Sequence, residues 1–290
     1  MRILLGILLQ ACLIATAAAQ QSGWPPAWFA AAEPSKIVGP IHFVGTRGLA
    51  AYLITTPAGH MLLDGGVPQT AGAIEASIRK LGFKPEDIKQ LLITHAHFDH
   101  AGTTAHFKAL SGANVAVMDL DVEQLNSGGR TDPVYGAMQP LHFPGVTADR
   151  MLKDGDTVSL GNIRMTARLG AGHTQGATTW VTNVEDAGRS YNVVFPCCVS
   201  VTPEYRLAIN PSYPGIADDY ARTFAMLETL TPDIWLAAHT ETFGFEDKRA
   251  RAIKDGAQAF VDPAGYRSYL ADWKAKLAVF VEQERSKSKP

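Results

Sequence analysis

Cysteine is scarce in this sequence, with three among 290 residues. Three cysteines do not make a disulfide framework, so the fold must depend on a hydrophobic core and on any metals that it binds. Cys12 lies near the N-terminus, whereas Cys197 and Cys198 are adjacent, a spacing at which a disulfide is strained and rare. Cys198 is either a small buried apolar residue or, as a thiolate, a zinc ligand.

The sequence also has little excess charge of either sign. The formal net charge is −2 and no basic cluster occurs, which argues against a nucleic acid or another polyanion as the partner. Hydrophobic residues make up 46% of the chain, a share that suits a soluble protein with a well-formed core.

Long apolar runs are absent except at the N-terminus. Arg2 precedes an apolar run over residues 3–15, and small residues follow at 17–19, as in a secretory signal peptide. The run is shorter than the ~20 apolar residues that a membrane-spanning helix needs. We therefore predict a signal peptide over residues 1–19, export to the periplasm and no membrane span. The tripeptide ending at Cys12 leaves a lipoprotein cleavage site as the alternative.

Strand-like and helix-like segments alternate along the rest of the chain. Apolar, β-branched runs predict strands, and apolar residues three or four apart, such as Ile74, Ile78 and Leu81, predict amphipathic helices. No linker divides residues 20–290, so we predict a single domain with two packed sheets between helical layers. The predicted strands are residues 51–55, 60–64, 91–94, 115–118, 163–168, 178–184, 191–195 and 234–238, and the predicted helices are residues 74–81, 104–110, 218–230 and 266–284.

No strand or helix periodicity is found between residues 127 and 147, where glycine, proline and aromatic residues prevail. A loop this long is usually functional or mobile. It is either a lid over a binding site or a plain surface loop.

The candidate ligands are densest in Thr94-His95-Ala96-His97-Phe98-Asp99-His100, directly after an apolar stretch. Histidine nitrogen and aspartate oxygen are ligands that zinc takes. A lone buried histidine is usually a hydrogen-bonded core residue, but four candidate ligands within six positions rarely arise that way. We predict a metal site with His95 and His97 on one strand face, and with Asp99 and His100 past the turn, in reach of a second metal.

Two more histidines follow predicted strands. His173 stands in Gly170-Ala171-Gly172-His173-Thr174, and His239 follows the strand at 234–238. The glycines allow the backbone to approach a site closely. Metal and active sites gather on loops at strand ends because the sheet holds them rigidly.

Together these segments resemble the metallo-β-lactamase superfamily and, within it, subclass B3. The superfamily resemblance rests on the His-Ala-His-Phe-Asp-His core, the later Gly-His-Thr and the distant histidine. The subclass resemblance rests on His100, the run at 172–180, and Asn210-Pro211-Ser212-Tyr213-Pro214 ahead of Asp218-Asp219-Tyr220. It extends from about Trp24 to the C-terminal helix.

The resemblance implies an α/β fold, the αββα four-layer sandwich with two mixed β-sheets flanked by helices, and two zinc ions per chain. Each zinc would keep an open coordination position, as catalysis requires. Asp64 resembles the family's buried aspartate that orients ligands, or it is a turn-forming residue. The implied ligands are His95, His97 and His173 for the first zinc and Asp99, His100 and His239 for the second.

The implied function is hydrolysis of the β-lactam amide bond of penicillins, cephalosporins and carbapenems by a monomeric enzyme. A zinc-bound hydroxide, oriented by Asp99, would attack the ring carbonyl. Trp28 and the loop around Tyr135 and Phe143 would clamp the ring substituents.

Two serines that help some subclass members to hold substrate are not found at the matching positions. Aligned from Asn210-Pro211, those positions carry Val199 and Val201, and Ser200 and Thr202 are one step off, on the opposite strand face. We therefore expect the substrate carboxylate to use other groups. The predicted substrate contacts are Trp28, Ser200 and Thr202.

A lactonase or a glyoxalase-like thioesterase on the same dinuclear zinc fold is the alternative function. Such relatives usually carry an aspartate that bridges the metals at the end of the strand predicted at 191–195. Here that strand runs into Phe195-Pro196-Cys197-Cys198 without a carboxylate, which favours the β-lactamase. A zinc carrier without turnover is a further alternative, and the open coordination positions argue against it.

Overall fold

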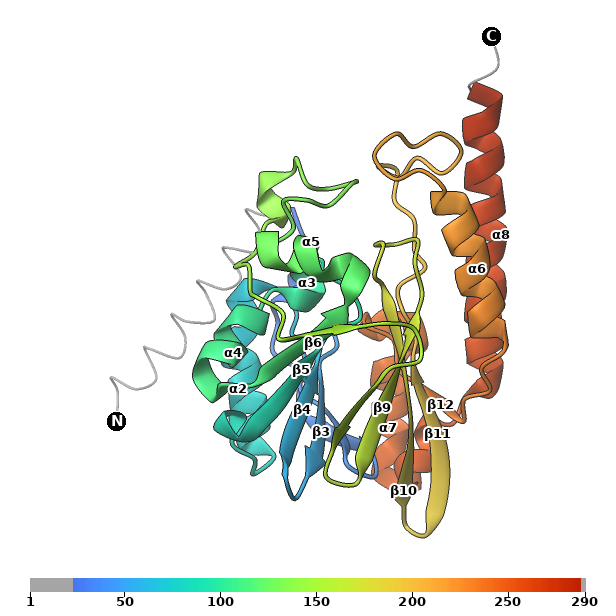
Figure 1. The fold of residues 1–290 in the computed structure, drawn as a ribbon. Helices are drawn as coiled ribbons and strands as arrows, with labels where there is room; N and C mark the ends of the chain where they lie inside the picture. The colour runs from blue at the N-terminus through green and yellow to red at the C-terminus, as the bar shows by residue number, and fades with distance from the viewer. Residues whose placement is uncertain (1–22, 288–290) are drawn as a thin grey trace.

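Two β-sheets lie face to face in the middle of the molecule, and helices cover the outer face of each (Figure 1). This arrangement confirms the predicted αββα sandwich. The structure, a computed structural model, describes residues 23–287, so the predicted signal peptide over residues 1–19 lies outside the described residues. The helices are α2 (Ala71–Lys80), α3 (Phe98–Ala101), α4 (Thr104–Ser111), α5 (Val122–Ser127), α6 (Ile216–Glu228), α7 (Phe245–Asp255) and α8 (Pro263–Lys287).

Within the described residues, one sheet has seven strands in the order β1-β2-β3-β4-β5-β6-β7. The pairs from β1 to β4 are antiparallel, and the pairs from β4 to β7 are parallel, so the sheet is mixed. Helices α2 and α4 cover its outer face. Its strands are β1 (Ser35–Val38), β2 (Ile41–Phe43), β3 (Tyr52–Thr56), β4 (Gly59–Leu63), β5 (Ile88–Leu92), β6 (Asn114–Met118) and β7 (Arg150–Leu152).

The second sheet has five strands in the described part of the chain, in the order β12-β11-β10-β9-β8. Only its β11–β12 pair is parallel. Tyr220, Phe224 and Leu227 recur at helical spacing along α6 and are buried, which holds α6 to the sandwich. The strands are β8 (Thr157–Leu160), β9 (Ile163–Leu169), β10 (Thr178–Asp186), β11 (Arg189–Phe195) and β12 (Ile234–Trp235).

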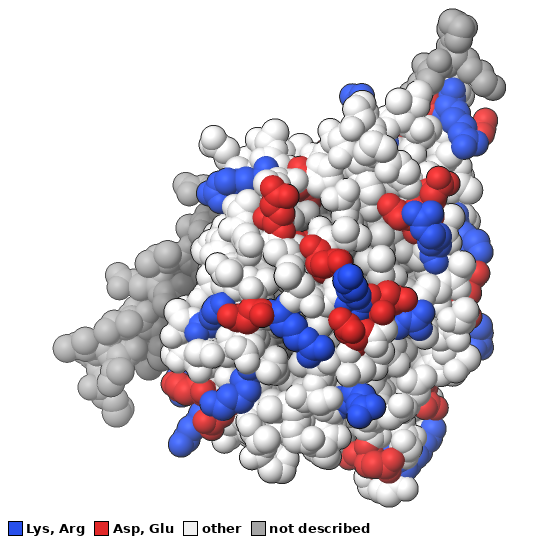
Figure 2. Space-filling view, in the orientation of Figure 1, with Lys and Arg blue, Asp and Glu red and all other residues white. Residues whose placement is uncertain are grey.

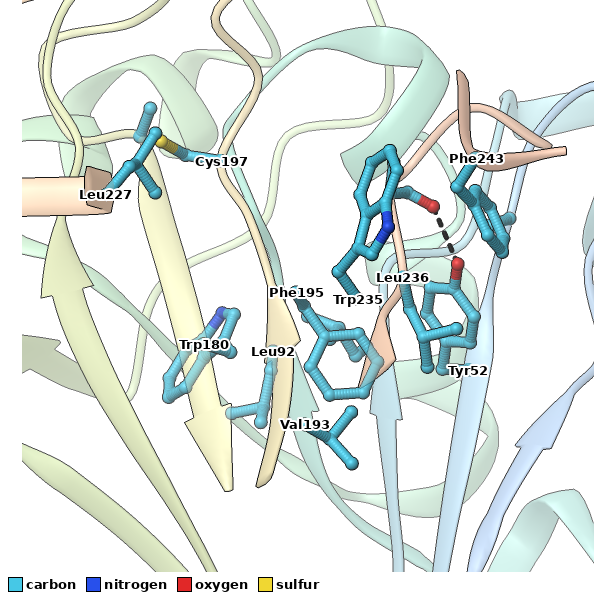
Figure 3. Close-up of a cluster of buried hydrophobic side chains, with 14 of the residues drawn as sticks. Tyr52, Leu92, Trp180, Val193, Phe195, Cys197, Leu227, Trp235, Leu236 and Phe243 are labelled. Atoms are coloured by element: carbon cyan, nitrogen blue, oxygen red, sulfur yellow. Dashed lines mark hydrogen bonds between the residues drawn. The ribbon is translucent and has the colours of Figure 1, made fainter. Parts of the chain in front are cut away.

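The core between the sheets is built from large aromatic and aliphatic side chains of both (Figure 3). Tyr52 from β3 meets Phe195 from β11 with ring centroids 5.0 Å apart. Trp180 from β10 is fully buried, and its indole N–H donates to the Ile93 carbonyl at 2.9 Å. That bond ties β10 to the segment that follows β5, which carries the candidate ligands.

The predicted strand at 234–238 is shorter in the structure, because β12 ends at Trp235. The Leu236 amide still donates to the Val194 carbonyl of β11 at 2.9 Å, and the two residues after it hydrogen-bond with the side of the other sheet. The Ala238 carbonyl accepts from the Ala50 amide at 2.8 Å, and the Ala237 carbonyl accepts from the Tyr52 hydroxyl at 2.6 Å (Figure 3). His239 thus lies where the chain bridges both sheets.

The elements that the sequence pattern missed are mostly short. Strands β1, β2, β7 and β8 have three or four residues each, too few for a clear period. Basic and acidic side chains are interspersed on the face shown in Figure 2, with no large patch of one sign. In the described range, no helix combines the length and apolar composition needed to cross a membrane.

Candidate metal centre

The histidine-rich motif lies in a loop and a short helix at one edge of the sandwich, not on a strand. β5 ends at Leu92, and Asp99 and His100 belong to α3. The prediction of His95 and His97 on one strand face is therefore wrong. The backbone leaves the sheet because carboxylates, rather than a neighbouring strand, take its amide hydrogens. Asp64 accepts from the Thr94 amide at 2.7 Å, and Asp121 accepts from the Ala96 amide at 3.0 Å.

Three histidines form the first cluster. His95, His97 and His173 are buried, and one ligand atom from each lies within 4.8 Å of the others. His173 reaches the motif from the loop between β9 and β10. A group of three imidazoles at this spacing matches the ligand set of a catalytic zinc with an open fourth position.

In each ring of this cluster a hydrogen bond occupies one nitrogen and, within residues 23–287, leaves the other free. His97 donates from Nε2 to Asp132 at 2.8 Å, and His173 donates from Nδ1 to the Ser200 carbonyl at 2.9 Å. His95 Nδ1 lies 3.1 Å from the Thr94 hydroxyl. The Nε2 atom of His95 is buried with no hydrogen-bond partner among the described residues, so a metal ion would satisfy it.

Burial keeps two of these rings, those of His95 and His173, in the form that binds metal. Burial, with the neighbouring imidazoles, holds the pKa of His95 well below its usual value. Burial also lowers the pKa of His173. Neutral imidazole carries the lone pair that a metal needs, so zinc does not have to displace protons from these rings at neutral pH.

The second cluster gathers around the Asp99 carboxylate. His100 Nε2 lies 3.2 Å and His239 Nε2 lies 3.5 Å from Asp99 Oδ2. His95, Asp99 and His100 also have ligand atoms within 4.8 Å of one another, so the two clusters adjoin. Burial alone would raise the pKa of Asp99, but the charge of His100 and its neighbours outweighs burial and lowers it. Asp99 is therefore ionised, as a metal ligand must be.

Asp64 lies behind both clusters. Its Oδ2 accepts from the Thr94 hydroxyl at 2.8 Å and is 3.5 Å from His100 Nδ1. Its φ of 57° also makes it the turn residue that ends β4, so the structure fits both interpretations of this residue. Because Thr94 in turn contacts His95, Asp64 is placed to orient one histidine of each cluster.

The sequence reasoning missed two buried carboxylates. Asp121 accepts from Ala96, from the Thr174 hydroxyl at 2.7 Å and from the Gly176 amide at 2.6 Å, so it joins the two loops that carry the first cluster. Asp132 accepts from His97 and from the Gln124 side chain at 2.7 Å. One signal was available, because Asp121 follows shortly after a predicted strand, where functional side chains collect.

Replacing Asp132 with asparagine is expected to weaken zinc binding by roughly 10–100-fold. Asp132 Oδ2 accepts from His97 and Gln124, and its Oδ1 accepts from the amides of Val134 and Tyr135, so an asparagine would turn its NH2 group towards one of these pairs of donors and weaken the hold on His97. Competition with a chromogenic chelator measures the affinity. The exposed Asp247, changed to asparagine, is the control. An unchanged affinity in Asp132→Asn would contradict the assigned role.

Both clusters open into a cavity of about 310 Å³, a volume that suits a small organic molecule. Trp28 from the N-terminal arm forms one wall. Tyr135, Met138 and Phe143 form another, so the long loop at 127–147 is part of the site and not a plain surface loop.

The segment after β11 alternates between cavity and core. Ser200 and Thr202 line the cavity, whereas Val199 and Val201 are buried in the core. The expectation that the valines occupy the positions facing the site is therefore wrong, because the core takes the apolar side chains. The Thr202 hydroxyl lies 2.6 Å from the Tyr135 hydroxyl and links the two walls. Trp28, Ser200 and Thr202 all reach the cavity, and their contact with substrate stays a prediction.

The two adjacent cysteines have different environments. Cys197 is buried, and burial raises the pKa of its thiol to about 12, so it is a protonated core residue. Cys198 lines the cavity with its sulfur 3.0 Å from the Ser200 hydroxyl. Among the described residues, neither cysteine belongs to a candidate ligand cluster.

Comparison with known proteins places the chain and its fold in a family. The family model described as the metallo-beta-lactamase superfamily matches residues 44–239, more than half of the chain. The native FEZ-1 metallo-beta-lactamase from Legionella gormanii is 38% identical, with a TM-score of 0.86, over 88% of this chain and 98% of that one. BJP-1, a subclass B3 metallo-beta-lactamase of Bradyrhizobium japonicum, is 37% identical, with a TM-score of 0.85, over 91% of this chain and 98% of that one.

A third solved structure is the class B3 di-zinc metallo-beta-lactamase LRA-12 from an Alaskan soil metagenome. It is 32% identical, with a TM-score of 0.84, over 88% of this chain and 96% of that one. These similarities confirm the resemblance to subclass B3 that the sequence predicted.

The similarity to curated proteins extends over shorter segments of the chain. Acyl-coenzyme A thioesterase MBLAC2 of Gallus gallus is 33% identical over 93 residues, which are 29% of this chain and 34% of that protein. N-acyl homoserine lactonase of Bacillus cereus is 29% identical over 79 residues, which are 19% of this chain and 32% of that protein. The chain spans about a third of the length of these curated relatives.

Proposed function

Because the chain belongs to the metallo-β-lactamase superfamily, we propose that it is a zinc-dependent β-lactamase that hydrolyses the amide bond of the β-lactam ring. One observation carries the proposal. Two adjoining clusters of candidate ligands open into a single cavity that has apolar walls and hydroxyl groups. Solved structures that align over nearly their whole length and are named β-lactamases support the choice of substrate.

The two clusters are the proposed metal sites. His95, His97 and His173 would hold one zinc, and Asp99, His100 and His239 would hold the other. The relative LRA-12 is described as a di-zinc enzyme, which supports two ions per chain. When bound, zinc supplies an activated water at neutral pH and a Lewis acid for the carbonyl oxygen.

The chain's own residues orient and enclose the reaction. The ionised Asp99 faces both clusters and would accept a hydrogen bond from the attacking water, which fixes the direction of its lone pair. Asp132 and the Ser200 carbonyl hold His97 and His173 in one tautomer. The Ser200 and Thr202 hydroxyls would donate to the substrate carboxylate.

The test is hydrolysis of a penicillin, a cephalosporin and a carbapenem by residues 20–290, assayed with chelator, without it, and after zinc is restored. We expect ring opening that chelator abolishes and zinc recovers. No opening of any ring by protein shown to contain zinc would reject the β-lactamase. The same sample would then be tested with an acyl-homoserine lactone and an acyl-coenzyme A thioester, whose hydrolysis would support the alternative functions. The relatives named for those activities align over shorter segments.

Export of a monomer is part of the proposal. The apolar run after Arg2 and the small residues at 17–19 support cleavage after residue 19. We expect protein purified from the periplasm to begin at Gln20 and to scatter light as a monomer. A periplasmic sample that still begins at Met1 would contradict cleavage.

A further inference from the structure

The proposed active-site cavity contains negative charge and lacks positive charge from side chains. Of the described residues that line it, none is lysine or arginine, and three are acidic. Asp99 and Asp132 are buried and engaged with histidines of the two clusters. Glu204 differs, because it is exposed and makes no hydrogen bond or ion pair within residues 23–287. It is the one uncompensated carboxylate among the described lining residues.

Glu204 lines the cavity beside the residues that carry its hydroxyl groups. Every second residue from Cys198 to Glu204 lines the cavity. These residues are Cys198, Ser200, Thr202 and Glu204. Burial raises the pKa of the Tyr135 hydroxyl, and the negative charge of Glu204 raises it further. Glu204 is therefore close enough to act on Tyr135, whose hydroxyl lies 2.6 Å from that of Thr202.

An aromatic surface also lines this cavity. The rings of Trp24 and Trp28 are stacked, with centroids 5.6 Å apart and planes 7° apart. Both line the cavity, as does Phe98, whose ring lies 5.1 Å from that of Trp24. Aromatic faces attract organic cations, and a carboxylate that lines the same cavity adds to that attraction.

We propose that Glu204 makes this enzyme selective for β-lactams whose side chain carries a positive charge, such as a quaternary ammonium group, over those with an added carboxylate. The inference rests on the proposed function. A single partly solvated charge changes such a preference by about fivefold. The preference must weaken as salt rises, because the Debye length falls from about 10 Å at 0.1 M to about 3 Å at 1 M.

The test compares kcat/KM for three cephalosporins that share one nucleus and carry a quaternary ammonium, a neutral or a carboxylate substituent. The proteins are the zinc-loaded wild type, Glu204→Gln, Glu204→Lys and Glu185→Gln. Glu185 is an exposed glutamate near the far end of β10 from the His173 loop, so it controls for loss of one negative charge.

We expect the ratio of cationic to anionic kcat/KM to fall about fivefold in Glu204→Gln and about 25-fold in Glu204→Lys, and to stay unchanged in Glu185→Gln. In 1 M salt the wild-type ratio should approach that of Glu204→Gln. A low-salt ratio that is equal in wild type and both Glu204 variants would overturn the inference, while leaving the β-lactamase function intact.

A binding measurement separates this inference from the proposed function. Tryptophan fluorescence would follow titration with benzyltrimethylammonium or with phenylacetate, neither of which needs turnover. We expect the cation to bind wild type about fivefold more tightly than it binds Glu204→Gln. Equal affinities would overturn the role of Glu204, whereas zinc-loaded wild type that opens no penicillin, cephalosporin or carbapenem ring would overturn the proposed function instead.

Discussion

Replacing His97 with alanine is expected to lower kcat/KM for β-lactam hydrolysis by a factor of about 1,000 or more. His97 is one of three almost equally spaced rings in the first cluster, with ring centroids 4.7 Å from His95 and 4.8 Å from His173. Two imidazoles hold zinc far less firmly than three do. A thousandfold loss corresponds to about 4 kcal/mol, within the several kcal/mol that a metal ion supplies to the transition state.

The measurement is chelator-sensitive turnover at fixed free zinc, together with the zinc content of the purified variant. His106→Ala is the matched control, because His106 is an exposed histidine on α4 that bonds Glu75. Near-wild-type chelator-sensitive turnover in His97→Ala would reject the first cluster as the catalytic metal site. Thermal unfolding in the presence of chelator shows whether the variant has kept its fold.

Replacing Asp121 with alanine is expected to destabilise the protein by about 3–5 kcal/mol and to abolish zinc binding at the first cluster. Asp121 is fully buried, and its loss leaves three donors, from Ala96, Thr174 and Gly176, without an acceptor. Those donors belong to the two loops that carry His95 and His173 and that keep the ligand atoms of these histidines close together. A cavity filled by water would restore only part of these bonds.

Urea denaturation in chelator measures this loss as a lower midpoint at an unchanged slope. Asp119→Ala is the control, since Asp119 is an exposed aspartate on the same helical turn. Asp121→Asn keeps one acceptor oxygen and should fall between wild type and Asp121→Ala. If Asp121→Ala unfolds at the wild-type midpoint, the carboxylate does not join the two loops.

Much of the fold follows from periodicity. Most of the longer elements were predictable because a buried strand or an amphipathic helix repeats its pattern over enough residues, as α6 does with Tyr220, Phe224 and Leu227. The 11-residue α7 was missed, because it buries only Phe245 and Lys248 and so shows no apolar repeat. Strands of three or four residues, such as β1 and β7, give no such pattern. Their positions depend on pairing with neighbours that are distant in sequence.

The sequence by itself determined the candidate ligands and the family, because zinc chemistry restricts which residues are useful and the motif concentrates them in one segment. Only the tertiary structure decided how they meet. His173 and His239 join the motif through loops from the other sheet. Asp132, which holds the His97 ring, and Asp121, which joins the two loops of the first cluster, have no characteristic sequence spacing that a pattern can reveal. The core likewise decided which side of the segment at 198–204 faces the cavity. Because Val199 and Val201 are buried in the core, Ser200, Thr202 and Glu204 line the cavity.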